Sequence, residues 1–156
     1  MAHLLFGHDQ VLAAWAAKRI PHVGDVGFGP CVAIGVASGP NSEDRLLAVA
    51  VYHEWSEAAG TIQISFAAAS PRWATRQTIG RLLFYPFEQL GVRKVWLAIP
   101  HDNARAIRFN VGIGMRRDGT LREHFGRGRH AVIVSMLRSE WQRSKWFAKA
   151  PVKEAA

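Results

Sequence analysis

The spacing of apolar residues changes several times along this chain, and each change marks a new predicted element. Short runs rich in apolar or β-branched residues, bounded by Gly, Pro, Asn or Ser, predict strands at residues 4–6, 31–37, 45–53 and 61–68. A turn is expected at 38–42, between the second and third of these runs. The run at 92–99 is apolar on both faces apart from its start, which is typical of a central parallel strand.

Elsewhere apolar residues recur every three or four positions, which predicts helices. The first helix should begin with Asp9 as its N-cap and end before Pro21. A longer helix is predicted over 75–90. Pro86 lies inside it and should bend it, because proline removes one backbone hydrogen bond.

The order of strand, helix and strand over 61–99 predicts a right-handed β-α-β unit, in which Gly91 closes the helix. A further helix at 103–112 and a hairpin of strands near 115–125 and 130–137 complete the pattern. With 156 residues and 49% hydrophobic composition, the chain can bury a core as one domain spanning residues 1–156. The predicted fold class is α/β, or more exactly α+β.

The segment 103–115 carries the most specific pattern in the chain. It places Asn103 at a helix start and Ala106 one turn later, with Gly114 and Met115 at the exit into the next strand. This order resembles the second half of the acetyl-coenzyme A site of the GNAT acyltransferase superfamily. The resemblance implies a central mixed, mostly antiparallel, twisted sheet of about six to seven strands, with a parallel splayed pair and about four flanking helices.

The resemblance implies that acetyl-coenzyme A (acetyl-CoA) is the cofactor, bound at the start of the helix 75–90. In the family a Gly-rich loop presents its amides to the diphosphate; here neither glycine is present. The loop instead offers two small residues and two cations that could pair with phosphate, or it is an ordinary capped helix with solvated arginines. The implied cofactor contacts are Phe66, Ala67, Ala68, Arg72, Trp73, Ala74, Thr75, Arg76, Asn103, Ala106 and Phe109.

In the family, backbone N–H groups of the splayed strand, here around 66–68, stabilise charge on the thioester oxygen. Asn103 would hold either the pantetheine region or the turn itself. The tyrosine that usually serves as general acid falls on Asn110, and the carboxylate of the splayed strand falls on Gln63. Alignment of two reactants contributes about 7–11 kcal/mol, so activity can survive without these two residues.

Candidates for replacing them are Tyr52, His53 and Glu54 at the end of the run 45–53, Ser135 on the last strand, and His124. Of these, Tyr52, His53 and Ser135 are taken as the catalytic candidates. His53 suits a base at neutral pH, because an imidazole titrates near pH 6.5, although it is also explained as a partly exposed residue at a strand end. No metal site is predicted. The hairpin 117–138 resembles more narrowly the branch that acetylates ribosomal-protein N-termini and amino sugars, and small phage and prophage members.

The formal net charge of +8 indicates acidic partners, or serves only an anionic cofactor. Cations crowd the hairpin 116–130, and they alternate with aromatic residues in the tail 138–156, a mixture that suits nucleic acid. The chain has one cysteine, no apolar run long enough for a membrane span and no secretory signal, which predicts a cytoplasmic protein. The oligomeric state is left open, a homodimer included.

The leading hypothesis from the sequence is an N-acyltransferase that moves an acetyl group from acetyl-CoA to an amine by direct attack in a ternary complex. The amine could belong to a small molecule, a protein or a nucleic-acid base. Two alternatives are a phage-type relative that modifies a DNA base and a non-catalytic basic module that binds nucleic acid on the same fold.

Overall fold

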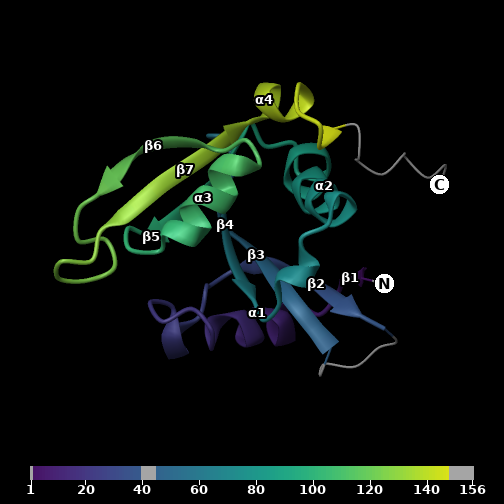
Figure 1. Cartoon of the computed structure of the whole chain (residues 1–156), viewed down its shortest axis with the longest axis horizontal. Helices are drawn as coiled ribbons and strands as arrows, with labels where there is room; N and C mark the ends of the chain where they lie inside the picture. Colours follow the sequence, from purple (N-terminus) through teal and green to yellow (C-terminus); the bar gives the residue numbers. More distant parts are fainter. Residues whose placement is uncertain (1, 40–44, 148–156) are drawn as a thin grey trace.

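The computed structural model describes residues 2–39 and 45–147, and its seven strands form one twisted sheet (Figure 1). Across the sheet the strands lie in the order β1-β2-β3-β4-β5-β7-β6. Every pair is antiparallel except β4 and β5, which run parallel. The strands are β1 (Ala2–Leu5), β2 (Cys31–Ser38), β3 (Leu46–Ser56), β4 (Thr61–Ala68), β5 (Lys94–Pro100), β6 (Arg116–Leu121) and β7 (Ala131–Leu137).

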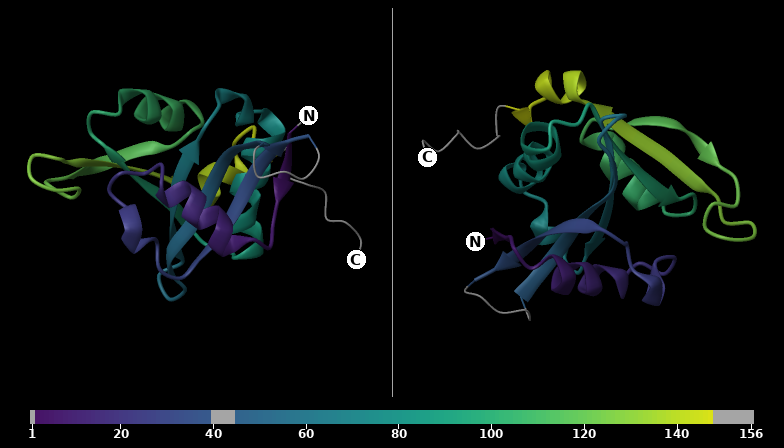
Figure 2. Two further views of the ribbon diagram at one scale, coloured as in Figure 1. Left: turned by 90° about the horizontal axis from the view of Figure 1, so that it is seen from below. Right: turned by 180° about the vertical axis from the view of Figure 1, so that it is seen from behind.

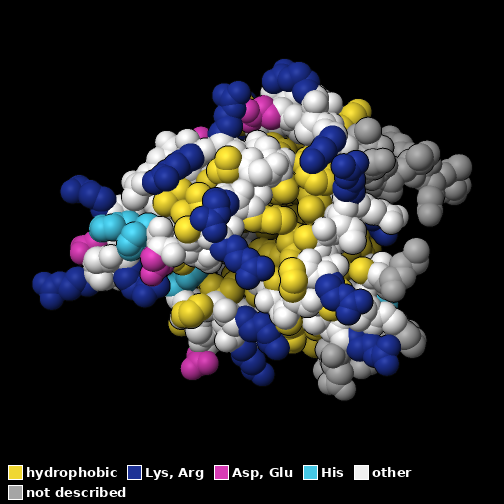
Figure 3. Space-filling model, in the orientation of Figure 1, with side chains coloured by type: hydrophobic (Ala, Val, Ile, Leu, Met, Phe, Trp, Pro, Cys, Tyr) yellow, Lys and Arg dark blue, Asp and Glu magenta, His cyan; other side chains and the backbone are white. Residues whose placement is uncertain are grey.

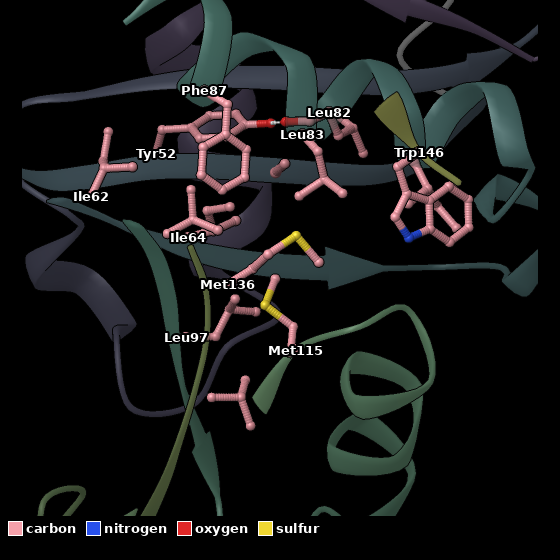
Figure 4. Close-up of a cluster of buried hydrophobic side chains, with 14 of the residues drawn as sticks. Tyr52, Ile62, Ile64, Leu82, Leu83, Phe87, Leu97, Met115, Met136 and Trp146 are labelled. Atoms are coloured by element: carbon pink, nitrogen blue, oxygen red, sulfur yellow. Dashed lines mark hydrogen bonds between the residues drawn. The ribbon is translucent and has the colours of Figure 1, made fainter. Parts of the chain in front are cut away.

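Helices cover both faces of the sheet (Figures 1 and 2). One face packs against α1 (Asp9–Ala17), in a core cluster that contains Leu12, Ala16 and Val49. The other face carries α2 (Arg76–Phe84), α3 (Ala104–Gly112) and α4 (Arg138–Gln142), over a larger cluster. Figure 4 shows part of that larger cluster, where Tyr52, Phe87 and Met136 meet. The predicted fold class is therefore confirmed.

The first helix begins differently from the prediction. Its N-cap is His8, whose side chain makes no capping hydrogen bond. Asp9 is the first helical residue, and its carboxylate accepts a hydrogen bond from the backbone N–H of Ala33 at 3.0 Å. Asp9 therefore fastens α1 to β2 instead of capping the helix.

The predicted helix over 75–90 is divided at Pro86. Thr75 caps α2 by accepting from the N–H of Thr78, and the α-helix ends at Phe84. A single π-helical turn, η4 (Tyr85–Gln89), follows, because proline has no N–H for the regular bond. Gly91 then turns the chain toward β5 with φ of +70°, a conformation that glycine adopts without strain.

The aromatic residues of the predicted basic tail are mostly part of the core. Trp141 is fully buried and stacks on Phe87, with ring centroids 5.1 Å apart. The Trp146 indole N–H donates to the carbonyl of Ile113 at 2.6 Å. These two rings are unavailable for stacking on nucleic acid, which corrects that part of the prediction. The rest of the tail, 148–156, and the turn residues 40–44 lie outside the described residues.

Two short 3-10 turns complete the described chain: η1 (Gly24–Val26), between α1 and β2, and η3 (Pro71–Trp73), before α2. Within 2–39 and 45–147, no helix combines the length and the apolar character needed to cross a membrane.

Candidate functional site

The two parallel strands of the sheet separate at their carboxyl ends. They pair only at Thr61 with Lys94, Ile62 with Val95, and Gln63 with Trp96. Beyond that point β4 continues to Ala68 and β5 to Pro100 without pairing to each other. Adjacent strands of a sheet normally pair along their common length, so this separation leaves a gap in the middle of the molecule.

A cavity of about 600 Å³ occupies the gap, a size typical of sites for small molecules and cofactors. Both faces of the sheet contribute to its walls: Ile20 and His22 on the α1 side, and Trp73 and Phe109 on the other. Figure 3 shows hydrophobic side chains open to view in the middle of this face of the molecule, with Lys and Arg side chains around them. The site thus combines an apolar interior with a cationic surround.

Backbone alternation directs two N–H groups of β4 into this gap. The N–H of Ala69 donates to the carbonyl of Leu47 on β3 at 2.8 Å. Successive N–H groups of a strand point to opposite edges. Those of Ala68 and Phe66 therefore point away from β3, into the gap between β4 and β5. The N–H of Ala67 points toward β3. Of the predicted run 66–68, the first and last residues therefore offer N–H groups to a ligand.

Three aromatic rings form one wall of the cavity. The Trp73 ring lies 4.3 Å from that of Phe66 and 5.4 Å from that of Phe109, measured between centroids. Ala106, on the same side of α3 as Phe109, also lines the cavity and contributes only a methyl group. The wall suits a long, thin and largely apolar ligand segment.

The start of α2 provides a site for anions beside the cavity. The N–H groups of Ala74 and Thr75 are occupied, because they donate to carbonyls of Pro71 and Trp73. In residues 2–39 and 45–147, the N–H groups of Arg76 and Gln77 have no hydrogen-bond partner. A helix N-terminus with free N–H groups favours negative charge, so the open amides begin at Arg76.

Arg72 and Arg76 flank this helix start. Both side chains are exposed, and neither takes part in an ion pair within 2–39 and 45–147. Arginine donates paired N–H groups that match phosphate oxygens. The two guanidinium groups are therefore free to contact the phosphates of a ligand whose other end enters the gap.

Two asparagines of α3 face the cavity with defined tasks. Asn103 caps the helix by accepting from the N–H of Ala106 at 3.2 Å, so it holds the turn. Asn110 stands at the expected tyrosine position; it is 9% exposed and donates to the carbonyl of Ala106 at 2.9 Å. A neutral amide cannot supply a proton as a phenol does, so the usual acid has no counterpart at this position.

His53 reaches the cavity through another residue. Its ring is 7% exposed and packs against Phe28, with centroids 5.1 Å apart. Its Nε2 lies 2.7 Å from Oγ of Ser65, which lines the cavity. Burial lowers the pKa of His53, and the nearby Glu54 carboxylate opposes this in part. The alternative of a partly exposed strand-end histidine does not describe this buried ring.

Tyr52 and Ser135 lie away from the cavity. The Tyr52 hydroxyl donates to the carbonyl of Leu82 at 2.6 Å and joins β3 to α2, and burial raises its pKa well above the ordinary value. The Ser135 hydroxyl donates to Oδ2 of Asp118 at 2.6 Å, between β7 and β6. Neither side chain lines the cavity, and both have structural partners.

Ser65 was missing from the candidates drawn from the sequence. It is a polar residue of β4 with apolar neighbours on either side, on the strand face opposite to Ile64. That alternation was readable in the sequence. Its closeness to His53 depends on the pairing of β4 with β3, which brings His53 opposite Gln63 and makes Ser65 a diagonal neighbour.

Two loops meet beside the cavity mouth. The ring of His22, which lines the cavity, stacks on that of Phe125 with centroids 4.0 Å apart. This contact joins the segment after α1 to the connection between β6 and β7. Burial, His124 and Arg129 lower the pKa of His22. In the same hairpin Arg116 pairs with Glu140 at 2.8 Å, so that cation is partly neutralised.

No protein-family model and no curated protein matches the chain. Solved structures do match. The spermidine N-acetyltransferase of Vibrio cholerae in complex with CoA and spermine has a TM-score of 0.69 at 17% identity, over 91% of this chain and 98% of that one. A dodecameric structure of the same enzyme scores 0.69 at 18% identity, over 91% and 96%. A chimera of Vibrio cholerae SpeG and hSSAT scores 0.70 at 17% identity, over 91% and 99%.

These matches show that the chain has the GNAT acetyltransferase fold. They place the separated strands β4 and β5 in a fold whose solved examples include a CoA complex. They give no support to the narrower resemblance to ribosomal-protein, amino-sugar or phage members, nor to DNA modification or nucleic-acid binding.

Proposed function

We propose that this protein is an N-acetyltransferase that moves an acetyl group from acetyl-CoA to an amine in a ternary complex. The observation that carries the proposal is the separation of β4 from β5 after Gln63 and Trp96, with a cavity of about 600 Å³ in the gap. A pantetheine arm is long, thin and flexible, so it fits between two strands that have lost their hydrogen bonds. The apolar walls favour its burial.

The residues around the cavity fit the parts of acetyl-CoA. The diphosphate would lie at the open N–H groups of Arg76 and Gln77, with the guanidinium groups of Arg72 and Arg76 beside it. The pantetheine would pass Ala106, Trp73 and Phe109. The thioester oxygen would accept from the N–H of Phe66 or Ala68.

The reaction joins the amine nitrogen to the thioester carbon and breaks the bond from carbon to sulfur. Coenzyme A leaves as a thiolate, and the amine gives up one proton. Thiols have a pKa near 8.5, so the leaving group departs without full protonation. The main tasks of the protein are therefore to align the two reactants and to stabilise the charge on the thioester oxygen.

Replacing both Arg72 and Arg76 with alanine is expected to weaken acetyl-CoA binding roughly tenfold to hundredfold. The variant loses two charge-assisted hydrogen bonds worth about 1.5–3 kcal/mol each, and solvent screening at these exposed positions reduces their combined contribution. Isothermal titration calorimetry measures the change. The control replaces Arg127 and Arg143, exposed arginines outside the cavity lining, and removes the same charge. Wild-type protein that gives no binding heat, or an equal loss in the control, would contradict the site.

The acceptor is proposed to be an amine without clustered positive charge. The cavity lining contains Arg19, His22 and Arg105, and it contains no Asp or Glu among the described residues. The charge of a polycation such as spermine would be opposed by these arginines and compensated by no carboxylate of the lining. The acceptor named with the solved Vibrio cholerae enzyme is therefore not carried over to this chain.

An acceptor panel tests this proposal. Thiol release from acetyl-CoA should be faster with a monoamine such as benzylamine, or with a peptide N-terminus, than with spermidine at equal concentration and neutral pH. Like charges raise the free energy of bringing a polyamine to Arg19 and Arg105. A higher kcat/KM for spermidine would refute this choice of acceptor, and it would not contradict the proposed cofactor site.

A further inference from the structure

We propose that Ser65 and His53 form a proton relay: the Ser65 hydroxyl contacts the acceptor amine, takes its proton, and passes its own to Nε2 of His53. The inference rests on the proposed acetyl transfer. It assigns Ser65 as a catalytic residue and His53 as a positioning residue that acts through it. It supplies a path for the proton in a site that lacks both a carboxylate at Gln63 and a tyrosine at Asn110.

Ser65 stands where the acceptor amine must arrive. It precedes Phe66, one of the two residues whose N–H groups point into the gap toward the thioester. Side chains alternate along a strand, so Ser65 faces the α1 side of the sheet, as His53 does, while Ile64 and Phe66 face the other side. The hydroxyl therefore borders the cavity on the side of Ile20 and His22.

The surroundings of His53 are unusual for a residue that only fills space. Its Nε2 lies 2.7 Å from the Ser65 oxygen, but its buried Nδ1 has no hydrogen-bond partner among the described residues. A buried polar atom without a partner costs about 1–3 kcal/mol, and native proteins rarely keep one without a use. A proton relay supplies such a use, since the ring must gain and lose a proton.

A strained residue places a carboxylate beside this ring. Glu54 has φ of +54°, in the left-handed region that costs energy for residues other than glycine, and it lies where the pairing of β3 with β4 is interrupted. Its Oε1 is 3.8 Å from Nδ1 of His53. When His53 holds the transferred proton, this carboxylate stabilises the imidazolium.

The proton balance closes within the site. As the bond from nitrogen to carbon forms, the amine gives one proton to Ser65 Oγ, and Ser65 gives its own to His53. The thioester electrons leave with sulfur, and His53 carries one added proton. That proton then returns to solvent or to the thiolate, and His53 becomes neutral again.

The relay needs neutral His53, so its pH dependence has a definite sign. The titratable groups around the ring are Glu54 on β3, His22 after α1 and Cys31 opposite on β2. Burial, the largest effect, and His22 lower the pKa of His53, and Glu54 raises it. Protonation of the acceptor amine lowers the rate at higher pH, and the additional acid limb that reports His53 should lie below the ordinary 6.5. Glu54→Gln should move this acid limb to still lower pH.

The first test needs no acceptor. Nitrogen NMR of His-labelled protein distinguishes the two neutral tautomers of His53 at neutral pH. The relay requires Nδ1 to carry the proton and Nε2 to accept from Ser65, and Ser65→Ala should then shift the Nε2 signal. A proton on Nε2, donated to Ser65, would leave the ring unable to accept and would overturn the relay.

The second test is kinetic, with acetyl-CoA and benzylamine. Ser65→Ala should lower kcat about 100-fold, the lower end for general-base assistance, and abolish the acid limb that reports His53, while Ser65→Thr retains most of the rate. Ser56→Ala, at the end of β3 and outside the cavity lining, is the matched control. A rate for Ser65→Ala equal to wild type, or persistence in it of the limb below pH 6.5, would refute the relay.

Two measurements separate the relay from its alternatives. Calorimetry with acetyl-CoA should give equal affinity for wild type and Ser65→Ala, so failure of the relay is distinguished from failure of the cofactor site. Intact mass after incubation with acetyl-CoA alone should show no acetylated protein. An acetyl group on Ser65 would make that residue a nucleophile and overturn its role as a proton carrier.

Discussion

Trp141→Ala is expected to lower the free energy of unfolding by about 3–5 kcal/mol, the usual cost of removing a large buried aromatic ring. Trp141 is fully buried, stacks on Phe87 and meets Phe147 edge-on with centroids 5.0 Å apart. The Arg138 guanidinium, 5.8 Å from the same ring, also hydrogen-bonds the Phe87 carbonyl and Glu88. The ring therefore holds the π-helical turn after α2 against α4, and its loss opens a cavity between them.

Urea denaturation at neutral pH measures the effect, with Trp55→Ala as the matched control. Trp55 is 50% exposed on β3, so its removal should cost far less than that of Trp141. Trp141→Phe should fall between the two, because the buried indole N–H has no hydrogen-bond partner among the described residues and its removal carries no such loss. Equal losses for Trp141→Ala and Trp55→Ala would contradict the packing described.

Local patterns predicted the elements well because each depends on neighbours in sequence. Strands such as β4 (Thr61–Ala68) have runs whose period and bounding turn residues are visible in a few positions. The turn at Gly91 was likewise predicted, since only a positive φ, for which glycine is suited, closes the helix there. The motif at Asn103 and Ala106 indicated the fold through its resemblance to the acetyl-CoA site of the GNAT superfamily.

Features that depend on contacts between distant parts of the chain could not be predicted from the sequence pattern. Asp9 could have capped its helix by itself, and its bond to Ala33 exists only because α1 packs on β2. Trp141 and Trp146 alternate with cations in a stretch that reads as a surface. Their burial follows from the position of α4 against the larger core cluster. A residue pattern gives the composition of a face, but only the packing decides which face is covered.

The candidate site likewise has residues that the sequence predicted and residues that only the structure could identify. The segments around Trp73 and Asn103 were found from order and spacing, and the structure brings both to one cavity. The sequence offered Tyr52, His53 and Ser135 because each is a polar residue on a strand, and it favoured His53 because an imidazole titrates near neutral pH. Hydrogen bonds to Leu82 and Asp118 occupy two of them, and only His53 connects to the cavity, through Ser65. The choice between them required the register of the sheet.

Filling the gap should weaken cofactor binding without unfolding the protein. Ala106 lines the cavity on α3, and its methyl group leaves room beside Trp73 and Phe109. A larger side chain there would occupy the volume proposed for pantetheine. Once pantetheine fills the cavity the site is packed, and overfilling a packed site costs about 1–3 kcal/mol, so Ala106→Leu should weaken acetyl-CoA binding roughly tenfold to hundredfold. Calorimetry measures this loss.

Ala104→Leu makes the same change on an exposed position of the same helix, outside the cavity lining, and should leave the affinity unaltered. Leucine is a good helix former, and at position 106 it enters open space, so the thermal unfolding midpoint of both variants should stay close to that of wild type. Unchanged affinity in Ala106→Leu would mean that acetyl-CoA does not pass between β4 and β5. An equal loss in both variants would trace the effect to the helix instead of the cavity.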